Sequence, residues 1–254
     1  MDTERIDNLG INDLKIIQDS NFFCFGTDSV LLANFVNSSS FKNIIVDLCT
    51  GTGIIPVILS AKCKYRKIFA VELQTEMFNL LDANIKLNKL NNCIVSINDD
   101  IKNVDKIREI IAENVQHQTV DIVVCNPPYK KIGSGSINEN QVKYIARHEV
   151  KCTLDDIFKT SSNLLRSHGK LYLVHKPERL CDIICIGRKY KMELKRLQFV
   201  YPTINKDPSI ILMECVKDGG NELKVLKPLI EYDSNGKYSK QMNEIYSKKG
   251  DDTK

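Results

Sequence analysis

The stretch Asp121-Ile-Val-Val-Cys-Asn-Pro-Pro-Tyr129 is an apolar run that ends abruptly in an asparagine, two prolines and a tyrosine. The run is typical of a buried strand. The prolines fix their own φ angles, remove two backbone donors and push Asn126 into an extended conformation, so the strand must end there. The Asn126 side-chain oxygen and the Pro127 carbonyl could then each accept one hydrogen of a planar amino group, while Tyr129 stacks on the attached ring. A strand followed by an ordinary Pro-Pro turn would give the same tetrapeptide.

Short apolar runs alternate with longer amphipathic stretches around this strand, which predicts βαβ units and a mostly parallel sheet. The expected strands are 43–48, 67–71, 93–97, 120–125 and 170–175, and the expected helices are 54–63, 75–89, 101–113, 154–167 and 181–190. Thr153 and Asp156 predict a capping box at the start of the fourth helix. The runs 194–201 and 209–216 are joined by a polar segment, so the seven-stranded sheet should end in an antiparallel hairpin.

Residues 1–40 precede this pattern and are expected to pack on the site as a preamble to a main domain over 41–218. They contain a short strand, 14–18, and a helix, 29–35, that Asp28 is expected to cap. Gly219-Gly220 opens a polar tail or extension, 219–254. The stretch 130–140 is rich in Gly, Ser and Asn without an apolar period, which predicts a mobile loop.

The composition favours a globular cytoplasmic protein, expected to be a monomer. Its 254 residues are 43% hydrophobic, enough to bury a sizeable core. No run of 18 apolar residues is present, and the N-terminus lacks the basic and apolar regions of a signal peptide, so no membrane partner is expected. Nine cysteines without a CxxC pair, together with four histidines, predict free thiols in a reducing compartment and no metal site.

The charge is distributed unevenly around a net value of +4. Residues 1–40 carry six acids and two bases, whereas residues 125–200 carry 15 Lys and Arg against 7 Asp and Glu. The basic excess begins at the Asn-Pro-Pro-Tyr turn, where a polyanionic substrate would have to lie. A solvated basic surface without a partner would produce the same asymmetry.

A glycine loop follows the first expected strand of the main domain. The run Ile44-Ile-Val-Asp-Leu48 continues into Cys49-Thr50-Gly51-Thr52-Gly53 and then a helix. Glycines at this position let backbone amides approach a ligand at the carboxyl edge of a parallel sheet. Glu72 ends the next strand 21 residues after Gly51, a spacing at which a carboxylate can take both hydroxyls of a ribose.

Two residues argue against a dinucleotide in this loop. Pro56 replaces the third small residue of the dinucleotide fingerprint. Asp47 would repel a pyrophosphate but attract an ammonium group. S-adenosylmethionine carries an ammonium, a ribose and an adenine without phosphate, so it is the predicted cofactor. Asp47 as a capping or strand-end carboxylate, and Glu72 as a solvated strand end, are the alternatives.

These residues resemble the class I S-adenosylmethionine-dependent methyltransferases, which have a Rossmann-like α/β fold. A narrower resemblance covers nearly the whole chain and is to the bacterial tRNA1(Val) adenine-37 amino methyltransferase family. It rests on Phe25-Gly-Thr-Asp-Ser-Val-Leu-Leu32, Asp47-Leu-Cys-Thr-Gly-Thr-Gly-Ile-Ile-Pro56, Ile145-Ala-Arg-His-Glu149 and Val174-His-Lys-Pro-Glu-Arg-Leu180. Cys49 stands where relatives commonly have Gly. Asp99 stands where Gly often precedes the adenine-contacting Asp, which leaves Asp99 and Asp100 as alternatives for that contact.

The resemblance implies methylation of the exocyclic amino group of an adenine in tRNA, in the anticodon-loop region. The implied catalytic residues are Asn126, Pro127 and Tyr129. The implied cofactor-binding residues are Phe25, Asp28, Asp47, Cys49, Thr50, Gly51, Gly53, Glu72, Asp100 and Asn126. The implied substrate-binding residues are Tyr129, Lys130, Lys131, Arg147 and His148, with His148 as a phosphate contact or structural histidine rather than a base.

Other functions fit the same residues. A glutamine side-chain amide presents the same NH2 geometry, and protein glutamine methylases that act on release factors also use Asn-Pro-Pro-Tyr; about 40 N-terminal residues are too few for the helical domain that they usually carry. Adenines in DNA or ribosomal RNA are further substrates to consider. A non-catalytic RNA-binding factor on a methyltransferase fold is the alternative from another class, and the intact Asp47, Gly51, Glu72 and Asn126 argue against it.

Overall fold

The structure is a computed structural model that describes residues 3–22, 24–129 and 152–247. The expected loop 130–140 and the motif 145–149 therefore lie outside the described residues. The same holds for Lys130, Lys131, Arg147 and His148, to which the sequence assigns substrate contacts.

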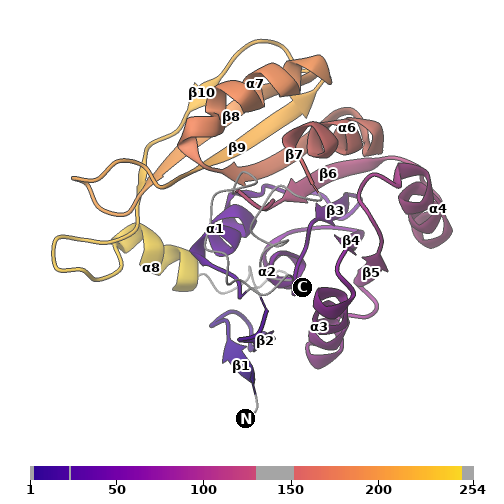
Figure 1. The fold of residues 1–254 in the computed structure, drawn as a ribbon, viewed down its shortest axis with the longest axis horizontal. Coiled ribbons are helices and arrows are strands. Elements are labelled where there is room, and N and C mark those ends of the chain that lie inside the picture. Colours follow the sequence, from indigo (N-terminus) through magenta and orange to yellow (C-terminus); the bar gives the residue numbers. More distant parts are fainter. Residues whose placement is uncertain (1–2, 23, 130–151, 248–254) are drawn as a thin grey trace.

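A nine-stranded sheet forms the centre of the molecule, in the order β10-β8-β9-β7-β6-β3-β4-β5, with β11 also paired to β8 (Figure 1). The strands are β3 (Ile44–Leu48), β4 (Lys67–Glu72), β5 (Ile94–Asn98), β6 (Val120–Cys125), β7 (Leu165–His175), β8 (Met192–Tyr201), β9 (Ile210–Lys217), β10 (Lys224–Val225) and β11 (Leu229–Ile230). The expected mostly parallel sheet and its antiparallel hairpin are confirmed. Because β9 lies between β7 and β8 and runs against both, β9 alone is reversed in this sheet. The short strands β10 and β11 extend the sheet beyond the seven expected strands.

Helices cover both faces of the sheet (Figure 1). They are α1 (Thr27–Phe35), α2 (Ile54–Lys62), α3 (Thr75–Leu87), α4 (Val104–Val115), α6 (Leu154–Leu164), α7 (Leu180–Lys189) and α8 (Lys240–Ser247), with a short 3-10 helix, η1 (Pro177–Arg179). Side chains alternate along each strand, so Ile45 of β3 packs with α1, α2 and α3, whereas Ile44 and Val46 pack with α4, α6 and α7. Two apolar cores therefore hold the sheet between two helical layers.

The helix starts differ in how well the sequence predicted them. The capping box of α6 is confirmed, since Thr153 and Asp156 each accept a hydrogen bond from the backbone N–H of the other. The prediction that Asp28 caps α1 is wrong, because Gly26 holds the cap position and Asp28 lies in the first turn. The helix α6 also ends earlier than expected, because Leu165 already pairs with Val120 of β6.

Two segments outside the central pattern pack against it. The strands β1 (Glu4–Asn8) and β2 (Lys15–Asp19) form a separate antiparallel hairpin, of which the sequence predicted only β2. The stretch after Gly220 returns to the sheet through β10 and β11 and buries Leu229 and Met242. In the described part of the chain, no helix has the length and apolarity that crossing a bilayer requires.

Gly53 is the glycine of the loop with the least room for a side chain. Its φ is 85°, and an added Cβ would lie 2.5 Å from Cδ1 of the fully buried Leu81. Gly236 has a similar φ of 72° with nothing within 4 Å of such a Cβ. Gly236→Ala is therefore expected to lower the free energy of unfolding by about 1–2 kcal/mol, the cost of a left-handed alanine. Gly53→Ala should cost about 1–3 kcal/mol more, because Leu81 must also move. Urea unfolding checks both values, and equal losses would contradict the steric explanation.

Candidate active site

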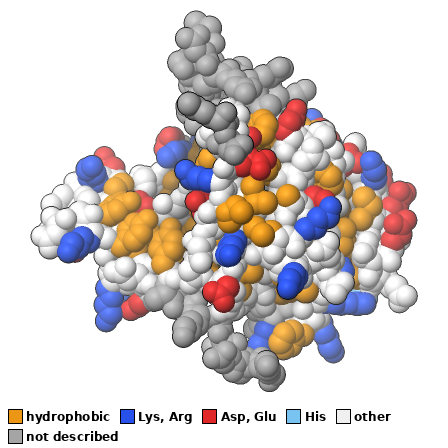
Figure 2. Space-filling view, turned by 90° about the horizontal axis from the view of Figure 1, so that it is seen from below, with side chains coloured by type: hydrophobic (Ala, Val, Ile, Leu, Met, Phe, Trp, Pro, Cys, Tyr) orange, Lys and Arg blue, Asp and Glu red, His pale blue; other side chains and the backbone are white. Residues whose placement is uncertain are grey.

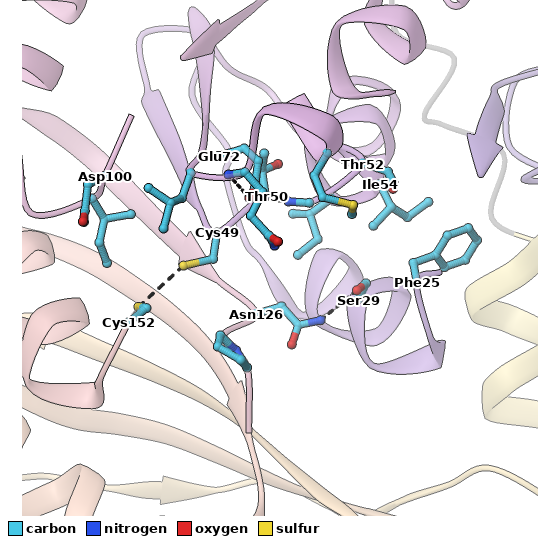
Figure 3. Close-up of a pocket in the computed structure, with 17 residues that line it drawn as sticks. Phe25, Ser29, Cys49, Thr50, Thr52, Ile54, Glu72, Asp100, Asn126 and Cys152 are labelled. Carbon is cyan, nitrogen blue, oxygen red and sulfur yellow. Dashed lines mark hydrogen bonds between the residues drawn. The ribbon is translucent and has the colours of Figure 1, made fainter. Parts of the chain in front are cut away.

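A pocket opens where β3, β4, β5 and β6 end, on the carboxyl side of the parallel sheet (Figure 3). It encloses about 880 Å³, including open solvent at its mouth. The strand β3 pairs with both β4 and β6, with Leu48 opposite Val71 and Cys125, so the residues that follow these strands converge. Residues expected from the sequence that line it are Phe25, Cys49, Thr50, Gly51, Glu72, Asp100 and Asn126. This is the edge at which open α/β sheets bind ligands.

The glycine loop forms one wall of this pocket. Gly51 and Gly53 have φ values of 61° and 85°, and Cys49 adopts a left-handed φ of 58° that glycine would adopt without strain. Gly53 lies behind the lining residues and starts α2 as its N-cap. The loop therefore turns sharply enough to bring its backbone to the pocket surface.

Asp47 lies beneath the loop instead of at the pocket surface. Its side chain is fully buried, and Oδ2 accepts a hydrogen bond from the Thr50 hydroxyl at 2.5 Å. Burial raises the pKa of Asp47 well above its usual value. Asp47 is not among the residues that line the pocket, and it supports the loop through Thr50.

Glu72 is held at the pocket wall by two backbone amides. Oε2 accepts a hydrogen bond from Gly51 N–H at 2.8 Å, and Oε1 accepts one from Gln74 N–H at 2.9 Å. Burial raises the pKa of Glu72 to about 7. Each carboxylate oxygen has further lone-pair capacity, so the residue can accept hydrogen bonds from two hydroxyls of a ligand.

Asp99 and Asp100 face different surroundings, which separates the two alternatives for the adenine contact. Asp100 lines the pocket next to Ile101, and Figure 3 shows it at one end of the site. Asp99 instead pairs with Lys106 Nζ at 2.5 Å and accepts a hydrogen bond from Asn103 Nδ2 at 2.6 Å. The geometry therefore favours Asp100 for a contact with a bound ligand.

Asn126 lies opposite the glycine loop and is held by residues of the N-terminal segment. Its Nδ2 donates to the Ser29 hydroxyl at 2.7 Å, and Figure 3 shows the amide nitrogen directed at Ser29 of α1. The Tyr129 hydroxyl lies within hydrogen-bond distance of both Asn126 Oδ1 and Asp28 Oδ2, the latter at 2.7 Å. Asp28 thus reaches the site through Tyr129 and does not line the pocket.

The Tyr129 ring is not part of the pocket lining. It packs edge-on against His175, with ring centroids 5.3 Å apart, and Lys176 Nζ lies 5.9 Å from its centroid. Stacking of Tyr129 on a substrate ring stays a prediction. Pro127 is buried, and the next residue, Pro128, lines the pocket.

Side-chain amides hold the N-terminal segment over the site. Asn84 of α3 accepts from Ile17 N–H at 2.6 Å and donates to Ile17 C=O at 3.1 Å and to Thr52 C=O at 2.9 Å. Asn88, one turn later, makes the same pair of bonds with the backbone of Lys15. The Gln18 side chain then accepts from the N–H of Phe25 at 3.0 Å, which places Phe25 at the pocket.

Several pocket residues were missed by sequence reasoning: Ser29, Thr52, Gln74, Met77, Pro128 and Cys152. Ser29 and Thr52 lie inside motifs quoted above, but nothing in the sequence shows that Ser29 meets Asn126, 97 residues later. The Cys152 thiol is 3.6 Å from that of Cys49 across the pocket wall. Among the residues that the structure describes, no group of three or more His, Cys, Asp or Glu side chains is arranged to hold a metal ion.

Comparison with known proteins finds similar tRNA methyltransferases. A family model described as the TRM5/TYW2 methyltransferase domain matches residues 32–125. The chain is 29% identical over 192 residues to a tRNA1(Val) (adenine(37)-N6)-methyltransferase from Porphyromonas gingivalis, covering 74% of this chain and 72% of that protein. It is 26% identical over 238 residues to the protein of the same name from Histophilus somni, covering 91% of each. The resemblance expected from the sequence is thereby confirmed.

Solved structures confirm the fold class. A predicted O-methyltransferase from Agrobacterium tumefaciens superposes with a TM-score of 0.65 at 19% identity, over 86% of this chain and 95% of that one. The TYW2 protein of M. jannaschii in complex with AdoMet superposes with a TM-score of 0.54 at 14% identity, over 85% of this chain and 86% of that one. The chain therefore has the Rossmann-like methyltransferase fold.

The Asn84 and Asn88 contacts allow a matched test of how the N-terminal segment is held. Asn84 is fully buried, so Asn84→Ala leaves backbone groups of Ile17 and Thr52 without partners and should lower the free energy of unfolding by about 3 kcal/mol. Asn88→Ala removes the equivalent contacts with Lys15 at a half-buried position that water can reach, and should cost about 1 kcal/mol or less. Chemical unfolding of both variants measures the difference, and equal costs would show that burial of Asn84 is unimportant.

Proposed function

We propose that this protein transfers the methyl group of S-adenosylmethionine to the exocyclic amino group of an adenine in the anticodon-loop region of a tRNA. The proposal rests on one observation above all: the Asn126 amide lines the same pocket as the glycine loop and Glu72. It is supported by the relatives named as tRNA adenine-N6-methyltransferases. We expect the protein to act as a monomer in the cytoplasm.

The residues of the pocket fit S-adenosylmethionine. Glu72 would accept hydrogen bonds from the ribose hydroxyls, and Asp100 would contact the adenine, next to the apolar Ile101. The backbone of the glycine loop would approach the amino-acid end, with Phe25 closing the pocket from the N-terminal segment. When bound, the cofactor supplies a methyl group on a positively charged sulfur.

Asn126 would activate the amino group of the substrate by position. The nitrogen lone pair of adenine is delocalised into the ring, which makes it a poor nucleophile. The Asn126 oxygen, together with the Pro127 carbonyl, would accept both amino hydrogens and draw the nitrogen toward pyramidal geometry. Holding two reactants in line contributes up to about 7–11 kcal/mol. The same oxygens stabilise the positive nitrogen formed at transfer more strongly than the neutral amine, so no dedicated base is needed.

An RNA loop suits a site of this kind, because a base must leave its stack to enter the pocket and does so most easily where it is unpaired. The basic residues expected to hold the flanking phosphates, Lys130, Lys131, Lys143, Arg147 and Lys151, lie outside the described residues. A second basic run, made of Arg188, Lys189, Lys191, Lys195 and Arg196, could extend this track or be a solvated surface. Four of its residues form ion pairs: Arg188 with Glu193, Lys189 with Asp155, Lys195 with Glu222 and Arg196 with Glu214. On the other side of the molecule, seen from below in Figure 2, acidic and basic side chains are also interspersed. We therefore assign no RNA contact to this second run.

Methyl transfer from labelled cofactor tests the substrate. Bulk tRNA should accept the label, whereas a translation release factor and duplex DNA should not, and mass-spectrometric nucleoside analysis should identify N6-methyladenosine. Asn126→Ala should lower transfer by about a hundredfold or more while cofactor affinity changes little, because the lost contact is made to the amine. Asn114→Ala, an exposed asparagine on α4, is the matched control. If only the release factor became labelled, the substrate would be a protein glutamine and not tRNA.

Glu72 predicts a pH dependence of cofactor binding. Ribose hydroxyls donate to the ionised carboxylate, whose pKa burial raises to about 7 in the free protein. Cofactor affinity should therefore fall as pH drops below about 7, approaching tenfold per unit, and level off above it. Titration calorimetry between about pH 5.5 and 8.5 should also detect proton release near neutrality. Glu72→Gln should bind more weakly with a flat profile, and an unchanged slope in that variant would assign the titration to another group.

A further inference from the structure

The Tyr129 hydroxyl has two acceptors but one hydrogen. Its oxygen lies 2.7 Å from Asp28 Oδ2 and also within hydrogen-bond distance of Asn126 Oδ1. A phenol donates one hydrogen bond, so at any moment only one of these oxygens receives it. The choice determines whether one of the two lone pairs of Asn126 Oδ1 is already taken before a substrate arrives.

Asp28 is the stronger of the two acceptors. A hydrogen bond to a carboxylate is about twice as strong as one to a neutral amide oxygen. The carboxylate is held in place, because its other oxygen accepts the Ser29 N–H at 2.8 Å. Burial, and then the charge of Asp28, raise the pKa of Tyr129 well above its usual value, so the hydroxyl keeps its hydrogen at neutral pH.

The Asn126 amide has little freedom to avoid the hydroxyl by moving. Its nitrogen donates to the Ser29 hydroxyl at 2.7 Å, and Ser29 is buried in the first turn of α1. The Asn126 oxygen has two lone pairs, but a Tyr129 hydrogen on one of them draws electron density from the oxygen and so weakens its hydrogen bond to the amino group during transfer. Avoiding this weakening requires another acceptor for the hydroxyl, and Asp28 is in place for it.

We propose that Asp28 is a positioning residue that draws the Tyr129 hydroxyl hydrogen away from Asn126 Oδ1 and so leaves this oxygen available to the amino group of the substrate. This inference rests on the proposed function, and it replaces direct cofactor contact as the role of Asp28. Asp28 should therefore affect the transfer step only when residue 129 has a hydroxyl group.

A double-mutant cycle tests the assignment. Asp28→Asn weakens the acceptor, and the amide can donate to the Tyr129 oxygen, so the hydroxyl hydrogen moves to Asn126 Oδ1. We expect kcat to fall about tenfold, with unchanged calorimetric affinity for S-adenosylmethionine. Tyr129→Phe keeps the ring and removes the competing hydrogen, so its own kcat is the reference against which the effect of Asp28→Asn is measured once the hydroxyl is gone. The double variant should match Tyr129→Phe, because without the hydroxyl there is nothing for Asp28 to withdraw.

Distinct results would overturn the inference. A double variant whose loss is the product of the two single losses would show that Asp28 and Tyr129 act independently. Weaker cofactor binding by Asp28→Asn would return Asp28 to direct cofactor contact. Lack of transfer by the wild-type protein to any nucleic acid would refute the proposed function instead. The same double-mutant cycle can be measured on the thermal unfolding midpoint, which needs no methyl-transfer activity. The double variant should have the midpoint of the less stable single variant. Additive decreases in the midpoint would show that Asp28 and Tyr129 do not interact, even if the protein transferred no methyl group.

Discussion

The site depends on the register of three parallel strands. The strand β3 pairs with β4 on one side and β6 on the other, and Leu48 lies opposite both Val71 and Cys125. The chain therefore leaves all three strands at the same level, which brings Cys49, Glu72 and Asn126 to one opening. A shift of one residue in either pairing would turn each strand's side chains to the opposite face and separate the loop from the amide.

Hydrogen bonds from outside the central sheet orient the side chains that the strand register brings together. Gly51 N–H fixes Glu72, and Ser29 fixes the Asn126 amide. Because Ser29 belongs to α1, the N-terminal segment is part of the site. A loop and a strand end alone would leave the amide free to rotate, and a rotated amide would present its nitrogen where an acceptor is required.

Local patterns in the sequence predicted the elements that build the pocket but not the contacts between them. The run 44–53, Glu72 and Asn126 were identified because strand, glycine loop and Pro-Pro stop each have a short-range cause. The roles of Asp28 and Tyr129 were not, because one hydroxyl joins residues 101 positions apart. The two-residue strands β10 and β11 have no period to detect, and β1 is held by pairing rather than by its own apolar pattern.

Asn84 and Asn88 also have a consequence for the behaviour of the protein in concentrated solution. One edge of β2 pairs with β1, and the other would present the free N–H and C=O groups of Lys15 and Ile17. Such an edge is a template for strands of other molecules. The two asparagine amides occupy those groups. This edge of β2 is therefore closed to a further strand by two side-chain amides.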